Sequence, residues 1–323
     1  MKSFALLLFM FVWLNPVVAQ YDFDAKEKER MAKGRVKVQT QWTHDFVDGK
    51  FSAKGYKSSV TKYDTRGNIK EVINYNEKGA VISVVVYEYD SRDNKVNYER
   101  YQDSRKRLIY SQKIMYDSKG NKIREYGFDG TSSYNNTFKY NENGKLDEIN
   151  YTINNVPIEK RTFYYSGNKT EILIYDKSNN LLYRQENTYN DNGLLVSELK
   201  AGSKGNMVHS LNLQYNNAGD LMEEVKMRAD EKLDYQKSYL YDSENRLIRE
   251  ETINLDGTKF VSHEYQYNSQ GDLVFETFKK TESAKEPSTK KYSYDTNGLL
   301  TNMDCYYATW PLKSLYKYTY EFY

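Results

Sequence analysis

The sequence has very little cysteine and no excess of charge of either sign. Cys305 is the one cysteine in 323 residues, so the chain cannot form an internal disulfide and depends on hydrogen bonds and packing. Lys and Arg number 47, and Asp and Glu number 45, which gives a formal net charge of +2. Because this balance leaves no broad basic field, nucleic acid is not an expected partner.

Long apolar runs are also scarce, and the clearest one follows Lys2 as FALLLFMFVWL. This run is too short to span a bilayer comfortably. Val17 and Ala19 provide the small residues that signal peptidase requires for cleavage after Ala19. We therefore predict a secretory signal peptide over residues 1–19, with an uncleaved anchor as the alternative. Cys305 lies far from this cleavage site, which excludes lipoprotein-type acylation. The protein is expected to be exported to the periplasm, the outer-membrane surface or the cell surface.

The sequence also lacks the residue patterns that are typical of catalytic and metal-binding sites. The three histidines, His44, His209 and His263, stand far apart with no second ligand at metal-like spacing. Cys305 has no motif around it and is predicted to be a buried structural residue. The sequence contains no GxSxG, no phosphate-binding glycine loop and no HExxH, and the loops that resemble calcium sites lack the closing Glu. We predict no catalytic residue, no metal and no cofactor, so the protein is not expected to be an enzyme.

What the sequence does have is tyrosine, 33 residues in all, and a recurring turn phrase that tyrosine leads. Successive phrases lie 24 to 27 residues apart and begin at Tyr63, Tyr89, Tyr116, Tyr140, Tyr165, Tyr189, Tyr215, Tyr241, Tyr267 and Tyr294. The Asp or Asn after the tyrosine can cap its own backbone, and a later Gly or Asn suits a positive φ. A fixed period of this kind indicates a repeat protein.

A second turn signal, such as YNEKGA from Tyr75 or LDGT from Leu255, stands midway between the phrases. Each unit of about 26 residues is therefore a β-hairpin, and ten units predict about twenty antiparallel strands. Bulky residues usually stand two positions before the leading tyrosine, with Asn187 as an exception, and are expected to stack into ladders. Since twist curls a large open sheet, we predict an all-β fold over residues 35–323: tandem hairpins in a long, curled, single-layer or solenoid-like sheet.

The phrases YDTRGNIKE, YDSKGNKIRE, YNENGKLDE, YDSENRLIRE and YDTNGLLT resemble the YD repeats of bacterial RHS-type cell-surface and toxin-shell proteins. The resemblance covers residues 35–323 and is specific because it recurs. It implies strand-turn-strand units that coil into a spiral sheet, which larger members wrap around a toxic C-terminal segment. No such segment and no DPxG-like motif follows the repeats here, so a toxin-delivery role is not expected.

The predicted strands lack a continuous apolar face. The strand LDYQKSYLY places Lys237 between Tyr235 and Tyr239, and neither face of it is purely apolar. We therefore expect the chain not to span a membrane, with an outer-membrane barrel as the alternative. Residues 20–34 contain the charged run DAKEKERMAKG, which lacks an apolar stripe. This segment is predicted to be a flexible leader or short helix, with a docking tail as the alternative.

Three functions fit these observations. The first is a non-catalytic binding or scaffold protein of the bacterial envelope that presents an extended tyrosine surface to a glycan or a protein. Its candidate ligand-binding residues are Tyr239, Tyr241, Tyr265, Tyr267, Tyr292 and Tyr294. The second is a structural subunit that docks by adding its terminal strand, LYKYTYEFY, to a partner. The third is an enzyme of unrecognised type.

Overall fold

The computed structural model describes residues 18–279, 281–308 and 312–323. One helix, α1 (Val18–Lys33), precedes a long series of strands. The strands are β1 (Val36–Val47), β2 (Lys50–Phe51), β3 (Tyr56–Tyr63), β4 (Ile69–Tyr75), β5 (Val81–Tyr89), β6 (Lys95–Gln102), β7 (Arg107–Tyr116), β8 (Lys122–Phe128), β9 (Ser133–Tyr140), β10 (Leu146–Ile153), β11 (Val156–Ser166), β12 (Lys169–Asp176), β13 (Leu181–Tyr189), β14 (Leu195–Gly202), β15 (Met207–Tyr215), β16 (Leu221–Arg228), β17 (Leu233–Tyr241), β18 (Leu247–Asn254), β19 (Lys259–Tyr267), β20 (Leu273–Phe278), β21 (Ser288–Tyr294), β22 (Leu300–Tyr307) and β23 (Leu312–Phe322). The predicted signal peptide lies outside the described residues except for its last two positions, which begin α1.

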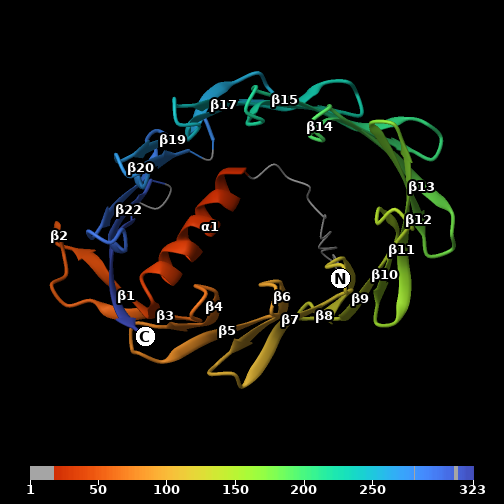
Figure 1. The fold of residues 1–323 in the computed structure, drawn as a ribbon. Helices are drawn as coiled ribbons and strands as arrows, with labels where there is room; N and C mark the ends of the chain where they lie inside the picture. The colour runs from red at the N-terminus through yellow and green to blue at the C-terminus, as the bar shows by residue number, and fades with distance from the viewer. Residues whose placement is uncertain (1–17, 280, 309–311) are drawn as a thin grey trace, which may run out of the picture.

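The strands form a closed ring. Strand β1 pairs antiparallel with β3 on one side and with β23 on the other, where His44 lies opposite Leu315. The described sheet has 23 strands, and β2 pairs only with β1, which leaves 22 strands in the ring (Figure 1). The prediction of antiparallel hairpins is confirmed, but the ring is closed and is not the solenoid-like sheet that was predicted. The curled sheet brings its first and last strands together, and their pairing satisfies both edges.

The predicted turn chemistry is present in the tyrosine-led phrases. In the first one, the Asp64 carboxylate accepts hydrogen bonds from the backbone N–H groups of Arg66 and Asn68, both at 2.9 Å. The N–H of Gly67 donates to the carbonyl of Asp64, and Gly67 has a φ of 81°. This is a type I turn followed by a residue with positive φ. Asn245 fills the same position in the β17–β18 turn with a φ of 58°.

The leading tyrosines join neighbouring hairpins. Tyr215, at the end of β15, donates its hydroxyl to the backbone carbonyl of Leu195, which opens β14. The same bond recurs at 2.7 to 3.4 Å in other repeats: Tyr116 to Lys95, Tyr140 to Lys122, Tyr165 to Leu146, Tyr241 to Leu221, Tyr267 to Leu247, Tyr294 to Leu273 and Tyr320 to Leu300. The phrase therefore reverses the chain, and in seven of its ten copies the leading tyrosine also bonds its hairpin to the one before it.

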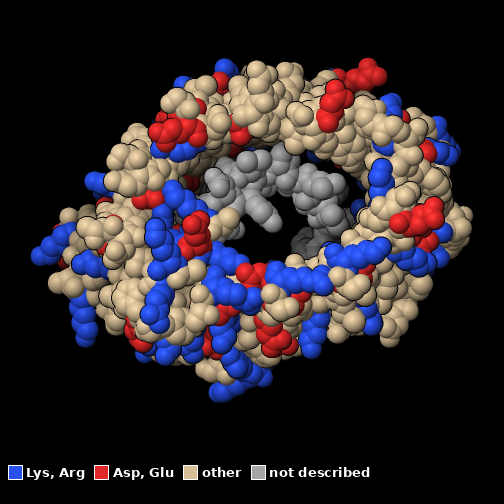
Figure 2. All heavy atoms as spheres, viewed as in Figure 1, with Lys and Arg blue, Asp and Glu red and all other residues tan. Residues whose placement is uncertain are grey.

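The two faces of the ring differ. Inner-face positions include Phe138 and Ile149, which lie opposite each other and are buried. The alternate, outer positions carry ion pairs with exposed lysines, such as Lys139–Glu148 (2.6 Å) and Lys62–Glu71 (2.6 Å). Basic and acidic side chains are interspersed over the visible surface in Figure 2. No helix within the described residues has the length and apolar character needed to cross a membrane.

Helix α1 lies inside the ring (Figure 1). It has 16 residues, so the predicted flexible leader or short helix is an ordered element that rests on the protein's own inner wall. Its main apolar contact is Met31, which is fully buried with Val36, Tyr63 and Leu299. This small cluster fixes the end of the helix where the chain enters β1.

Candidate functional site

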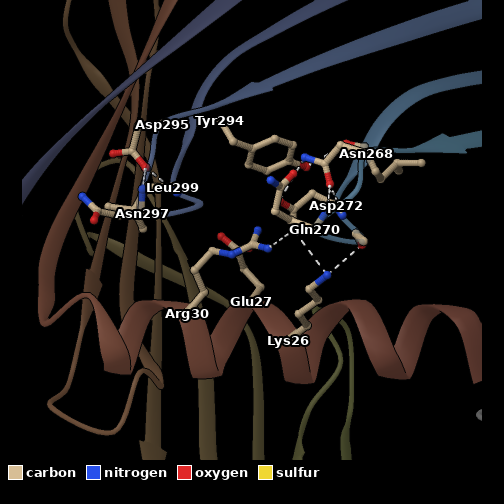
Figure 3. Close-up of polar contacts among 12 residues, drawn as sticks. Lys26, Glu27, Arg30, Asn268, Gln270, Asp272, Tyr294, Asp295, Asn297 and Leu299 are labelled. Atoms are coloured by element: carbon tan, nitrogen blue, oxygen red, sulfur yellow. Dashed lines mark hydrogen bonds and ion pairs between the residues drawn. The ribbon is translucent and has the colours of Figure 1, made fainter.

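One side of α1 is held by the turn between β19 and β20. Lys26 and Arg30 both form ion pairs with Asp272, and the Lys26 ammonium also donates to the carbonyl of Gly271 at 2.7 Å. Figure 3 shows these side chains reaching from α1 toward the turn. The guanidinium of Arg30 also lies over the ring of Tyr294, 5.3 Å from its centroid. Positions 26 and 30 share one helix face, so a single stripe of α1 makes all of these contacts.

The other side of α1 is held by turns on the far side of the ring closure. The Lys28 ammonium pairs with Asp93 at 2.8 Å. The helix backbone also rests against Gly67, where an added Cβ would lie only 2.1 Å from the carbonyl oxygen of Lys28. Because residues 26 and 28 lie on roughly opposite faces of a helix, α1 is wedged between two groups of turns. Its position is set by charge pairs and close backbone contact, which explains why the segment needs no apolar stripe.

A cavity of about 480 Å³, here called the chamber, lies between α1 and strands β17–β21. Its wall consists of Asp220, Tyr241, Asn245, Arg246, Leu247, Tyr265, Tyr267, Gly271, Asp272, Leu273, Glu276, Lys290, Tyr292 and Tyr294, and α1 contributes Lys26, Glu27 and Arg30. This volume falls in the range typical of small-ligand sites. The wall mixes aromatic rings with charged groups of both signs, which suits a ligand that carries many hydroxyl or amide groups.

The structure brings five of the six predicted site residues to the chamber: Tyr241, Tyr265, Tyr267, Tyr292 and Tyr294. The sixth, Tyr239, lies outside its lining, where its hydroxyl donates to Glu224 at 3.3 Å. The six tyrosines serve two purposes. Tyr241, Tyr267 and Tyr294 bond to backbone carbonyls and are structural, as the repeat requires.

The other three tyrosines stand beside glutamates that sequence reasoning missed. Tyr239 donates to Glu224 and Tyr292 donates to Glu276, the latter at 2.9 Å. Tyr265 lies directly opposite Glu276 in the sheet, as Tyr239 lies opposite Glu250. The three glutamates are spaced 26 residues apart, each at the fourth position of its strand, so the repeat itself contains the signal.

The electrostatics keep these tyrosines protonated. Burial, and then the negative charges of Glu224 and Glu250, raise the pKa of Tyr239. Burial together with Glu250 and Glu276 does the same to the pKa of Tyr265. All of these hydroxyls therefore remain donors at neutral pH.

Two acidic groups at the contact between α1 and the β19–β20 turn, Asp272 and Glu27, have pKa values that are shifted in opposite directions. Burial opposes the charge of Asp272, but a hydrogen bond from Asn268 and the cations Arg30 and Lys26 hold the pKa of this carboxyl below its usual range. For Glu27, burial outweighs the neighbouring Arg30 and raises the pKa of the carboxyl. Asp272, which contacts the helix, and Glu27, which belongs to it, therefore respond to pH in opposite ways.

The remaining candidates for chemistry are dispersed. His209 bonds to Glu198 at 2.8 Å, His44 bonds to the carbonyl of Ser52, and His263 stacks on Tyr265. The Cys305 thiol is fully buried, as predicted, and burial raises its pKa to about 11. No group of three or more His, Cys, Asp or Glu side chains that could hold a metal occurs among the residues that the structure describes.

Fold and site together define a closed antiparallel β-barrel with an internal helix and a tyrosine-lined chamber. No family model matches the sequence, and no curated protein matches it. Among solved structures, one similar chain belongs to the crystal structure of TcdB2-TccC3-TEV, with 11% identity and a TM-score of 0.29. The match covers 83% of this chain and 18% of that chain, so the present protein spans less than a fifth of it. A second is a porin-like protein from Bacteroides uniformis, with 11% identity, coverage of 88% and 98%, and a TM-score of 0.31. Similarities this low support no shared function, and the closure of the ring rests on the strand pairing of this chain.

Proposed function

We propose that this protein is a non-catalytic, exported binding protein of the bacterial cell envelope and that it holds a glycan in the chamber beside α1. The observation that carries the proposal is the convergence of five predicted tyrosines and the partly buried Glu276 on one cavity of about 480 Å³. Aromatic rings pack against the apolar faces of sugars, and carboxylates and amides hydrogen-bond their hydroxyls. We keep the YD-repeat relationship and the signal peptide as parts of this proposal.

The geometry favours a slender ligand over a folded partner. The tyrosine surface faces the inside of a closed ring and lies beside α1, so a slender ligand fits it better than the surface of a folded protein. A short oligosaccharide reaches such a chamber through the barrel opening. The glycan alternative is therefore preferred over the protein alternative for these residues.

The structural-subunit alternative has less support. This alternative required the last strand to be an unpaired edge, but β23 pairs with β22 along one side and with β1 along the other. A subunit role would need another surface. The outer positions carry the ion pairs described above and also Arg184–Glu171 at 3.2 Å, with both side chains about half exposed. Charged pairs at lipid-facing positions are costly, so we propose that the outer wall faces water.

A glycan array followed by calorimetric titration tests the proposal. The mature protein should bind at least one envelope-type glycan, and Tyr265→Ala should weaken that binding about tenfold or more, because the ring lines the chamber. Tyr164→Ala is the matched control, since this tyrosine is 53% exposed and lies outside the chamber lining. Failure to bind any glycan, or equal losses in the two variants, would overturn the proposal.

A further inference from the structure

The inner wall beside the chamber repeats one arrangement of side chains. A glutamate at the fourth position of one strand is combined with a tyrosine two residues before the leading tyrosine of the next strand. We call each such combination a station, and there are three of them: Glu224–Tyr239, Glu250–Tyr265 and Glu276–Tyr292. They occupy three consecutive hairpins, β16–β17, β18–β19 and β20–β21.

The combination is confined to this arc of the barrel. In the hairpins that flank the three stations, the equivalent pairs are Glu198 with Leu213 on one side and Met303 with Tyr318 on the other. Each of these pairs lacks either the tyrosine or the carboxylate. Turn formation does not require the glutamates, because the turns with and without them have the same hydrogen bonds. The three stations therefore differ from the structural part of the repeat and mark a local surface.

The spacing of the stations is fixed by the sheet. Neighbouring strands lie about 4.8 Å apart, so equivalent positions two strands apart repeat every ~10 Å along the inner wall. A β-(1→4)-linked glycan turns each sugar over relative to the last, so its repeating unit is a disaccharide, which spans a comparable distance. A chain of this kind that lies across the strands would meet the same tyrosine and carboxylate at each repeat.

Helix α1 lies at one end of this row of stations. Glu276 and Tyr292 line the chamber together with Lys26 and Arg30 of α1. The opposite station, Glu224–Tyr239, lies outside the chamber lining, where Glu224 also accepts a hydrogen bond from Tyr235. The row therefore runs from α1 out along the inner wall toward β16.

From this geometry we infer that the ligand is a linear β-(1→4)-linked glycan that lies across the strands, with one end against α1 and one disaccharide repeat at each station. The inference rests on the proposed function and adds the shape, linkage class and direction of the ligand. Acetamido sugars fit best, because an acetamido N–H donates to a carboxylate and its methyl group packs on a tyrosine ring.

The test uses purified chito-oligosaccharides, titrated calorimetrically as the di-, tetra- and hexasaccharide. The expected result is a dissociation constant that falls about tenfold with each added disaccharide, because each occupied station adds a hydrogen bond to a charged group. Equal affinity for all three lengths would overturn the inference, and so would binding of none of them. In both cases, binding to another glycan on the array would leave the proposed function standing.

Two tyrosine variants locate the stations. Tyr239→Ala removes the ring at the far station, so it should weaken the hexasaccharide about tenfold and leave the disaccharide unchanged. Tyr292→Ala, at the station beside α1, should weaken all three lengths, since the disaccharide gains extra donors from Lys26 and Arg30 there. An equal effect of Tyr239→Ala on the shortest and longest ligands would contradict the order of the stations. Thermal melts of both variants show that the barrel remains folded.

Discussion

The hydroxyl of Tyr215 donates a hydrogen bond to the backbone carbonyl of Leu195, 2.8 Å away in the preceding repeat. Leu195 pairs with Tyr189 just after a shift in the strand register, where the regular ladder of hydrogen bonds is interrupted. The tyrosine therefore supplies a donor at the irregular point that each turn creates. Because the bond recurs around the ring, the leading tyrosine is a structural part of the repeat.

Removal of this hydroxyl should weaken the barrel measurably. Tyr215→Phe keeps the ring and leaves the Leu195 carbonyl without this donor, so we expect the free energy of unfolding to fall by about 1 kcal/mol. Urea denaturation followed by circular dichroism measures the change. Tyr164→Phe provides the comparison, because that ring is exposed. Identical denaturation midpoints for the two variants would show that the bond contributes nothing.

The turn glycines allow a second test. Gly271 has a φ of 75°, and a β-branched residue resists this conformation. Gly271→Val should therefore lower stability by roughly 1–3 kcal/mol. Gly271→Asn should cost much less, because Asn245 already occupies the equivalent position of the β17–β18 turn. If Val and Asn give the same melting temperature, the turn does not impose the expected strain.

The contact between Gly67 and α1 can be tested separately from the backbone strain that a substitution causes in the turn. Gly67 and Gly144 occupy the same turn position with φ values of 81° and 74°. An added Cβ at Gly67 meets the carbonyl oxygen of Lys28 at 2.1 Å, whereas an added Cβ at Gly144 meets no atom within 4 Å beyond its chain neighbours. Gly67→Ala should therefore speed hydrogen exchange in residues 25–33, while Gly144→Ala should leave that exchange unchanged. Equal exchange in both variants would mean that α1 does not depend on this contact.

The sequence predicted the local features well because short-range chemistry determines them. The Asp64 turn depends on residues no more than four positions apart, and the period of the tyrosine phrase places each strand. Turns at 103–106 and 229–232 gave no signal, because their positive-φ positions are filled by Asp103, Ser104, Arg105 and Glu231 in place of glycine.

Long-range features were not predictable from the same patterns. Ring closure depends on pairs such as Val36 with Phe322, which carry no local mark. The position of α1 was missed because it docks through Lys28–Asp93 and the Asp272 ion pairs, and a search for an apolar stripe does not detect such contacts. The sequence placed the candidate tyrosines on strands, but it did not show that their side of the sheet lies inside the barrel, because that depends on ring closure.

The lone cysteine should be inert. The side chain of Cys305 is fully buried, and burial raises its pKa to about 11, so almost no thiolate exists at neutral pH. We expect no reaction with a thiol reagent in the native protein at pH 7 and complete reaction after denaturation. Rapid labelling of the native protein would mean that β22 opens readily at this point.

The last prediction concerns the pH dependence of the ion pairs that dock α1 against the inner wall. The pKa of the Asp272 carboxyl is lowered in the folded protein, so its ion pairs stabilise the docked helix above the unfolded value near ~3.9. This contribution is lost as the pH falls through the lower, folded pKa. Asp93, which pairs with Lys28, also has a lowered pKa and adds to the same trend. The raised pKa of Glu27 acts in the opposite sense, since its contribution is lost as the pH rises through the folded value.

We therefore expect α1 to loosen below about pH 4. A fluorophore on Glu29→Cys in a Cys305→Ser background reports this loosening as a fall in anisotropy, because position 29 is exposed. In Asp272→Asn the anisotropy should already be low at neutral pH and should change little on acidification. Asp176→Asn is the matched control, since Asp176 also has a lowered pKa but forms the remote β12–β13 turn. If Asp176→Asn loosens the probe as much as Asp272→Asn does, the effect comes from general destabilisation of the turns and not from the hold of Asp272 on the helix.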